Sequence, residues 1–243
     1  MTQLRVRFGG GMNRKEWNRL AATFEKNVCD ISREETADRI RGYVVAAKIP
    51  KQGAVLADMG CGIGTFILQY GHRFSEIFGV EYAAKIIARA KQRCADVAGV
   101  RWLTAGIEAA GRHIGARADL TVCMNVITVP STAKRRAMWN GLAAVTRRGG
   151  RALVVVASIE SEIMIEGLLR EGRKIRDDGL VDHDGALQKH FARQELRDDF
   201  SAAGFAVTKI GKAFYPWSKE GLRETPKRRV NPPWDWVALA EKL

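Results

Sequence analysis

Five short apolar runs, separated by segments long enough to form a helix, constrain this chain more than any other feature of its sequence. The runs are AVLADMG from Ala54, then EIFGVEY, VRWLT, ADLTVCMNV and RALVVVAS. Strands buried on both faces have this composition, and their alternation with helices indicates parallel strands joined by right-handed crossovers. Two later runs, GFAVTKIGKAF and WDWVALAEKL, predict the last two strands. We therefore expect a three-layer α/β fold whose sheet is mostly parallel and ends on an antiparallel strand.

The flanks of this pattern are predicted to be helical. In residues 1–50 apolar side chains recur at steps of three and four residues, which indicates an amphipathic helix and then a second helix from about Arg33 to Lys48. Ser32 and Glu35 have the spacing of a capping box for that second helix. We expect residues 1–50 to be a helical cap on a single domain, and residues 51–243 to form its body with a helical insertion at about 158–203. Two helices and a loop rich in Asp and Gly are predicted in the insertion, part of which could act as a lid.

A glycine-rich turn follows the first apolar run. Asp58 precedes Gly60, Cys61, Gly62 and Gly64, and a helix-length segment comes next. Glycine allows a sharp turn and a close approach of the backbone to a ligand, and free N–H groups at a helix start face that ligand. The GxGxxG spacing of dinucleotide-binding folds is not met, because the glycines alternate and Thr65 and Phe66 follow.

Glu81 ends the next apolar run, about twenty residues later. A carboxylate at the tip of the second strand can accept hydrogen bonds from both hydroxyl groups of a ribose. Asp58 would be badly placed beside a pyrophosphate but suits a cationic ligand. The pair favours a nucleoside-like ligand that carries positive charge.

With these residues in place, the sequence resembles the class I S-adenosylmethionine-dependent methyltransferases. The family's first motif, Val-Leu-Asp-x-Gly-Cys-Gly-x-Gly, is similar to VLADMGCGIG here, with one residue added before Asp58. The resemblance covers residues 54 to 157 well and the flanks in outline. It implies a Rossmann-like, seven-stranded methyltransferase sheet and S-adenosylmethionine as cofactor.

The same resemblance implies a set of cofactor-binding residues: Asp58, Gly60, Cys61, Gly62, Gly64, Glu81, Tyr82, Gly106, Ile107 and Asn125. Glu81 would bind the ribose, Tyr82 would pack on the adenine, and Asn125 would lie near the methionine moiety. The family's usual Asp after the third strand is replaced by Gly106, which leaves the adenine amino group to backbone groups or to Glu108. We also expect Glu81 to make no contact that folding requires.

No catalytic residue and no metal site are predicted. Methyl transfer from a sulfonium needs alignment more than a general base, and no histidine stands out as a catalytic base. His72 and His113 lie in predicted surface connections, and His183 and His190 lie in the charged insertion. Asn231-Pro232-Pro233-Trp234 imitates a base-flipping motif but precedes the last strand instead of closing the fourth, and Cys123 lacks an adjoining Pro-Cys pair. Three tryptophans, Trp217, Trp234 and Trp236, could wall an acceptor pocket, although packing in the core is the simpler interpretation.

The composition of the chain indicates its cellular location and the charge of its possible partners. An apolar fraction of 46% and a charged fraction of 28% are ordinary for a soluble domain, and no apolar run is long enough to span a bilayer. Four widely spaced cysteines and the absence of a signal-like segment predict a cytoplasmic protein with reduced thiols. The formal charge of +13 favours anionic partners, yet the basic residues are spread along the chain in short runs.

These observations predict a methyltransferase that acts on a small-molecule acceptor. An RNA or other nucleic-acid methyltransferase is the nearest alternative, because of the charge. A protein that binds S-adenosylmethionine without turnover is a second alternative. The acceptor and the oligomeric state are not encoded in any pattern that we can read.

Overall fold

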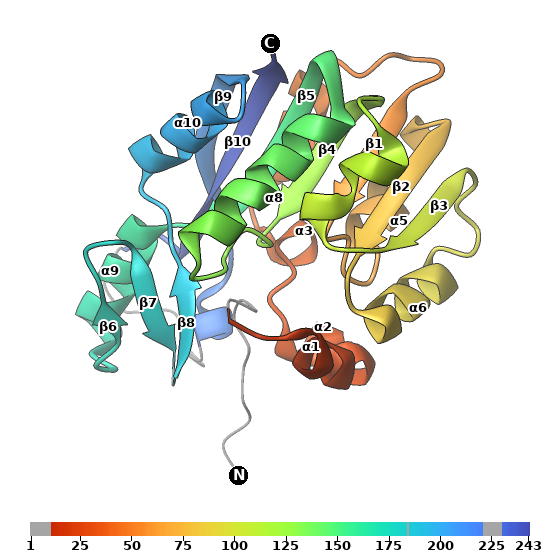
Figure 1. Cartoon of the computed structure of the whole chain (residues 1–243). Coiled ribbons are helices and arrows are strands. Elements are labelled where there is room, and N and C mark those ends of the chain that lie inside the picture. The colour runs from red at the N-terminus through yellow and green to blue at the C-terminus, as the bar shows by residue number, and fades with distance from the viewer. Residues whose placement is uncertain (1–10, 184, 221–229) are drawn as a thin grey trace.

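A seven-stranded sheet with strand order β3-β2-β1-β4-β5-β10-β9 forms the centre of the protein (Figure 1). The computed structural model describes residues 11–183, 185–220 and 230–243. Only β10 is antiparallel to its neighbours, so the expected mostly parallel sheet with an antiparallel last strand is confirmed. In this order the strands are β3 (Val100–Thr104), β2 (Glu76–Glu81), β1 (Val55–Met59), β4 (Ala118–Met124), β5 (Thr146–Ala157), β10 (Trp234–Lys242) and β9 (Phe205–Phe214).

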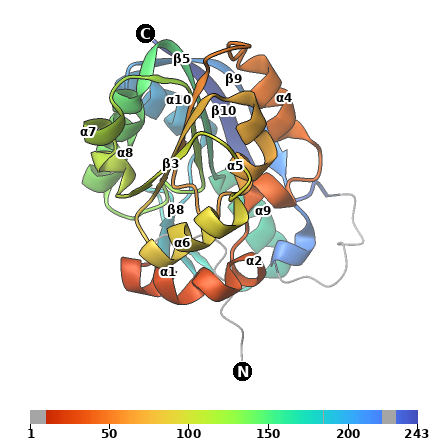
Figure 2. The ribbon, with the colours of Figure 1, turned by 90° about the vertical axis from the view of Figure 1, so that its right-hand side faces the viewer.

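Helices cover both faces of the sheet, which explains why the strand sequences are continuously apolar (Figure 2). Successive strand residues face opposite layers, so that Leu56 packs in one core cluster and Ala57 in the other. The first layer contains α7 (Gly111–Ile114), α8 (Thr132–Val145) and α10 (Arg193–Ala202). The second contains α3 (Ile31–Glu34), α4 (Arg39–Ala46), α5 (Thr65–Tyr70) and the end of α6 (Ala84–Arg93).

The N-terminal helices are shorter than the periodicity predicts. The first becomes α1 (Arg14–Leu20) and α2 (Phe24–Asn27), joined by a 3-10 turn, and the second is divided into α3 and α4. The division occurs because the Glu35 carboxylate accepts hydrogen bonds from the N–H groups of Ala37 and Arg39, which competes with helical bonding. The predicted Ser32–Glu35 capping box is therefore wrong: Asp30 caps α3, and a capping box is formed instead by Asn13 and Glu16 at the start of α1.

The insertion after β5 is only partly helical. It begins with α9 (Ile159–Leu169) and ends with α10, as expected, but the predicted loop forms a small sheet of β6 (Lys174–Ile175), β7 (Leu180–His183) and β8 (Ala186–Lys189). The Asp and Gly residues that suggested a loop lie at its turns. Asp182 accepts the N–H of Gly185, whose φ is +89°, so these residues close the β7–β8 hairpin.

The parallel strands end on the same side of the molecule, and N-terminal segments lie close to these carboxyl ends. Figures 1 and 2 show α1 and α2 at this end of the sheet. Phe24 and Val28 pack there with Ile63 and Ile86, so the N-terminal segment shares a small core with the glycine turn and α6. Among the described residues no helix is long and apolar enough to cross a membrane.

We expect Phe200→Ala to lower the free energy of unfolding by ~3–5 kcal/mol, the usual cost of truncating a buried aromatic side chain. Phe200 is fully buried, and its ring contacts Trp139 edge-on with ring centroids 4.8 Å apart. Urea denaturation of both proteins measures the change. Leu68→Ala, at a side chain that is 47% exposed, is the control and should change stability by less than ~0.5 kcal/mol.

Candidate functional site

The glycine turn after β1 is attached to the neighbouring strand by two hydrogen bonds. The N–H groups of Gly60 and Cys61 both donate to the carbonyl of Val80, at 2.8 and 2.9 Å. Gly60 has a φ of +83°, and a Cβ at this position would overlap the Val126 side chain. Glycine is thus required both by the backbone conformation and by the packing against the segment after β4.

A cavity opens beside this turn, and nine of the ten predicted cofactor-binding residues line it: Asp58, Gly60, Cys61, Gly62, Glu81, Tyr82, Gly106, Ile107 and Asn125. They come from the ends of β1, β2 and β4 and from the segment after β3. Gly64 does not line the cavity. It begins α5 with a φ of +78°, where a Cβ would lie 2.7 Å from Cys94 Sγ, so it shapes the turn from behind.

Four residues with carboxyl groups line the cavity, and three of them have a raised pKa: Asp30, Asp58 and Glu81. Burial, with added repulsion from Asp30 and Glu81, raises the pKa of Asp58 to about 8. Burial also raises the pKa of Glu81 to about 7. It raises the pKa of Asp30 as well, although hydrogen bonds to Asp30 act in the opposite direction. Within a chain of net charge +13, the cavity is therefore locally acidic and suits a cation.

Glu81 has a structural role that we did not predict. Its side chain is only 9% exposed, and its Oε1 accepts the N–H of Ala83 at 2.9 Å. It also accepts a backbone hydrogen bond from Gly62, which lowers its pKa against the effect of burial. The carboxylate thus ties the glycine turn to the end of β2, a contact that the sequence did not predict.

Asn125 is held at the edge of the cavity by a residue from the far end of the chain. Its φ is +56°, its N–H donates to the Val155 carbonyl, and its Nδ2 donates to Asp235 Oδ2 at 2.8 Å. Asn125 Oδ1 and Asp58 Oδ2 are buried acceptors with no hydrogen-bond partner among the described residues. Buried acceptors normally have a donor, so these two atoms fit a ligand that brings one, such as an amino group.

The Glu108 carboxylate lies in the space that a side chain at Gly106 would occupy. A Cβ added at Gly106 would collide with the Glu108 carboxylate, and both residues line the cavity. The acidic group is present, two residues later in the sequence than the pattern predicts. The 3-10 turn Ile107–Ala109 brings it back to the same space.

Several residues that sequence reasoning considered do not line this cavity. Trp217, Trp234 and Trp236 are buried outside it, and Trp236 Nε1 donates to Glu160 at 3.0 Å. Trp17 and Phe24 do line it, together with Val28 from the same N-terminal segment. Asn231, Pro232 and Pro233 form an irregular approach to β10, as expected. The basic run 227–229 lies outside the described residues.

Sequence reasoning missed Asp30 and Asp235, the two carboxylates that complete the polar surroundings of the site. Asp30 caps the short helix α3, whereas the predicted capping box started that helix at Ser32. Asp235 is a single acidic residue between two tryptophans. An N-cap signal at Asp30 was readable, since Ser32 and Glu34 follow it. No local pattern announces Asp235, because its partner lies 110 residues away.

The family described as "Methyltransferase domain" matches residues 56–150, which contain the glycine turn, Glu81, Glu108 and Asn125. This match shows a methyltransferase domain over residues 56–150, and the sheet order and the acidic cavity agree with the class I, S-adenosylmethionine-dependent type.

Known proteins of this class are similar to the chain at a distance. The magnesium-protoporphyrin O-methyltransferase of Synechocystis sp. is 22% identical over 119 residues, which are 49% of this chain and 51% of that protein. The 23S rRNA (uracil(1939)-C(5))-methyltransferase RlmD of Thiobacillus denitrificans is 37% identical over 43 residues, only 18% of this chain and 10% of that protein. The matches therefore span about half of the first relative's length and a tenth of the second's.

A solved structure extends the likeness to most of the chain. The 1,6-didemethyltoxoflavin-N1-methyltransferase of Burkholderia thailandensis, with bound 1,6-didemethyltoxoflavin and S-adenosylhomocysteine, superimposes with a TM-score of 0.65. The match covers 94% of this chain and 86% of that one at 16% identity. The likeness thus includes the flanks of the family match, and at this identity it is a likeness of fold.

We expect the ligand-free protein to lose stability as the pH rises from about 5 to about 8. Burial raises the pKa of Glu81 from 4.5 to about 7 and that of Asp58 from 3.8 to about 8, so in this range the folded protein holds protons that the unfolded chain has released. Each pH unit in this range lowers the free energy of unfolding by up to about 1.4 kcal/mol per group, and the loss ends above the raised pKa values. Thermal melts across this range measure the slope.

Asp58→Asn should flatten this slope, because it removes the group with the higher of the two values. Asp96→Asn, at an exposed side chain, is the matched control and should keep the wild-type slope. A wild-type protein whose stability is constant over this range would contradict the buried acidic cavity.

Proposed function

We propose that this protein transfers the methyl group of S-adenosylmethionine to a small-molecule acceptor. The observation that carries the proposal is the mixed lining of one cavity, which combines buried acidic groups with apolar side chains. Its lining residues include the acidic Asp30, Asp58 and Glu81 and the apolar Trp17, Phe24, Val28 and Val129. The acidic groups suit the charged cofactor, and the apolar side chains suit an acceptor shielded from water.

The cofactor would lie across the carboxyl ends of β1, β2 and β4. Glu81 would accept hydrogen bonds from the ribose hydroxyls, and Tyr82 would pack on the adenine with Glu108 near its amino group. Asp58 and Asn125 would receive the amino group of the methionine moiety, since each has a buried oxygen without a described partner. Gly60, Cys61, Gly62 and Ile107 would line the path between these contacts, and Gly64 would support the turn.

Acceptor selection is assigned to the segments that cover the cavity. Trp17 and Phe24 come from the N-terminal helices, and Val129 comes from the loop between β4 and α8. Enclosure by these segments favours a small acceptor over a nucleic acid strand. Alignment of acceptor and sulfonium in such a site can supply up to ~7–11 kcal/mol of the barrier reduction, so the reaction does not require a strong base.

The printed names of the similar proteins support the same acceptor class. One methylates magnesium-protoporphyrin, and another is solved with 1,6-didemethyltoxoflavin, both small molecules. A relative named as a 23S rRNA methyltransferase matches over a short segment of 43 residues. We also propose that the protein works in the cytoplasm, which agrees with four buried free cysteines.

We expect Glu81→Gln to weaken the binding of S-adenosylhomocysteine by about ten- to a hundredfold, because hydrogen bonds to a charged group contribute ~1.5–3 kcal/mol each. Glutamine has nearly the same volume and keeps an oxygen for the N–H of Ala83, so folding should be preserved better than with alanine. Calorimetric titration measures the affinity, and a thermal melt checks the fold.

Glu76→Gln is a matched control for this experiment. Glu76 is on the same strand at its opposite end, where its Oε1 lies 3.3 Å from Arg101 on the surface. This variant should bind S-adenosylhomocysteine as the wild type does. Equal affinities for the wild type and Glu81→Gln would refute the role of Glu81 in binding the ribose.

We expect label from methyl-labelled S-adenosylmethionine, added with the protein to a cell extract, to appear in the small-molecule fraction. Gly62→Val should abolish this transfer, because Gly62 has a φ of +51° and a Cβ there would lie 3.1 Å from the Phe24 ring. Chromatography of the extract locates the label. Label that remains with RNA and is released by nuclease would show a nucleic-acid methyltransferase instead, and cofactor binding with no transfer in any fraction would indicate a non-catalytic binding protein.

A further inference from the structure

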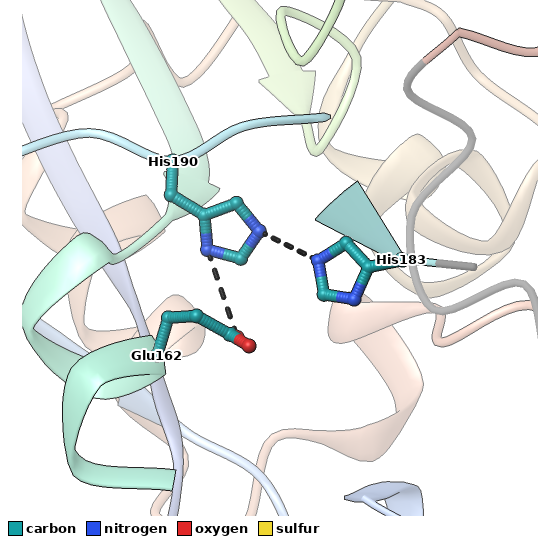
Figure 3. A group of neighbouring side chains, drawn as sticks. All are labelled: Glu162, His183 and His190. Atoms are coloured by element: carbon teal, nitrogen blue, oxygen red, sulfur yellow. Dashed lines mark hydrogen bonds and ion pairs between the residues drawn. The ribbon is translucent and has the colours of Figure 1, made fainter. Parts of the chain in front are cut away.

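Three side chains that can bind a metal come together in the insertion, outside the residues that line the cofactor cavity. Glu162 belongs to α9, His183 ends β7, and His190 follows β8 (Figure 3). Glu162 and His190 are fully buried, whereas His183 is half-buried. One ring nitrogen of each histidine and one carboxylate oxygen lie within 4.8 Å of one another.

The distances in this cluster are close to those around a shared cation. The two Nε2 atoms are 3.2 Å apart, and Glu162 Oε2 lies 3.8 Å from the other ring nitrogen of His190, Nδ1. A histidine binds one ion through one nitrogen, so binding by all three residues requires the His190 ring or the carboxylate to turn. Two ligands at ~2.0–2.1 Å from a tetrahedral zinc ion are separated by about 3.3 Å, so the ring nitrogens are already at ligand spacing. A proton shared between the rings accounts for the same separation, and the carboxylate beside them is what favours a metal. Two imidazoles and a carboxylate are a common ligand set for zinc and iron(II).

The backbone around the cluster is well supported. His183 pairs with Ala186 in the β7–β8 hairpin, and the N–H of His190 donates to the Gly179 carbonyl at 2.8 Å. The next residue, Phe191, donates to the Ala157 carbonyl at the end of β5. Metal ligands need such support, because binding is strong only when few conformations have to be given up.

Arg173 orients the carboxylate. Its Nη1 donates to Glu162 Oε1 at 2.7 Å and lies 3.6 Å from Glu220 Oε2, and its Nη2 pairs with the exposed Glu171 carboxylate, so three carboxylates share one guanidinium. The hydrogen bond to Oε1 fixes the position of the Glu162 carboxylate. Because Oε1 is engaged by Arg173, Glu162 would bind a metal through Oε2 alone.

The cluster is connected to the cofactor cavity by one backbone contact. The N–H of Lys189, next to His190, donates to the carbonyl of Thr128 at 2.8 Å. Thr128 and the following residue, Val129, line the cavity. The cluster is therefore one hydrogen bond away from the loop that we assign to acceptor selection.

We propose that Glu162, His183 and His190 form a binding site for one divalent transition-metal ion of the zinc type. Glu162 Oε2 and one nitrogen of each ring are the protein ligands. Three protein ligands leave a coordination position for water or for another oxygen donor, on the half-buried side where His183 lies. The inference does not rest on the proposed methyl transfer, because the metal binds whether or not cofactor and acceptor are present.

The test is a titration of chelator-treated protein, free of cofactor, with Zn²⁺ in a calorimeter, and in parallel with Co²⁺ by visible absorption. We expect one ion per chain in the wild type and a rise in the melting temperature when Zn²⁺ is added. His183→Ala should weaken binding at least ~100-fold, since even the loss of an outer partner of a metal ligand costs ~10–100-fold. His183 is the least buried of the three residues, so this variant is the one that retains the fold most readily.

His113→Ala is the matched control. His113 is an exposed histidine in α7, on a different element, and its removal should leave the affinity and the cobalt spectrum unchanged. Glu162→Gln is the second variant, and it should lower the affinity while keeping the volume of the side chain. A wild-type protein that binds neither ion would overturn the proposal and favour a proton shared between the rings. Equal binding by the wild type and His183→Ala would also overturn it, by placing the ion elsewhere.

Discussion

The carbonyl of Val80 accepts two hydrogen bonds, from Gly60 and Cys61, and the candidate site depends on this junction. It attaches the turn after β1 to the end of β2, which brings Asp58 and Glu81 to the same cavity. Val126 occupies the space that a side chain at Gly60 would need, so the end of β4 can approach the turn closely. A glycine turn of this kind lets the ends of β1, β2 and β4 line one cavity, because no bulky side chain lies between them.

The cost of this arrangement is the burial of acidic groups. Asp58 and Glu81 are at most 9% exposed, and burial raises the pKa of both. The folded protein therefore keeps, near neutral pH, carboxyl groups that a solvated chain would ionise freely. A cationic ligand reverses this preference by stabilising the ionised forms. Burial of Asp58 and Glu81 thus lowers the stability of the ligand-free protein and favours a cationic ligand. The local acidic groups, and not the net charge of the whole chain, set this preference.

Polar groups from distant parts of the chain lie together at the carboxyl ends of the parallel strands. Because β10 is antiparallel, its first residues lie at this end of the sheet, and Asp235 there orients Asn125 from β4. The insertion after β5 returns to the same end through Phe191 and Lys189, so the cluster of Glu162, His183 and His190 lies one backbone contact from the loop lining the cavity. The topology alone places two separate groups of chemically active side chains close to each other.

The sequence by itself determined the strands, the glycine turn, the acidic tip of β2 and the class of protein. Each of these is written in a contiguous segment, where apolar runs and glycine spacing act on neighbouring residues. Only the tertiary structure decided the rest. The insertion forms strands where Asp and Gly suggested a loop, because its apolar residues find partners across a hairpin. The Glu108 carboxylate lies beside Gly106 and lines the cavity because a 3-10 turn follows β3. Asp235 and His190 acquire their partners through contacts between segments that lie far apart in the chain, and periodicity in one segment carries no record of what lies opposite it.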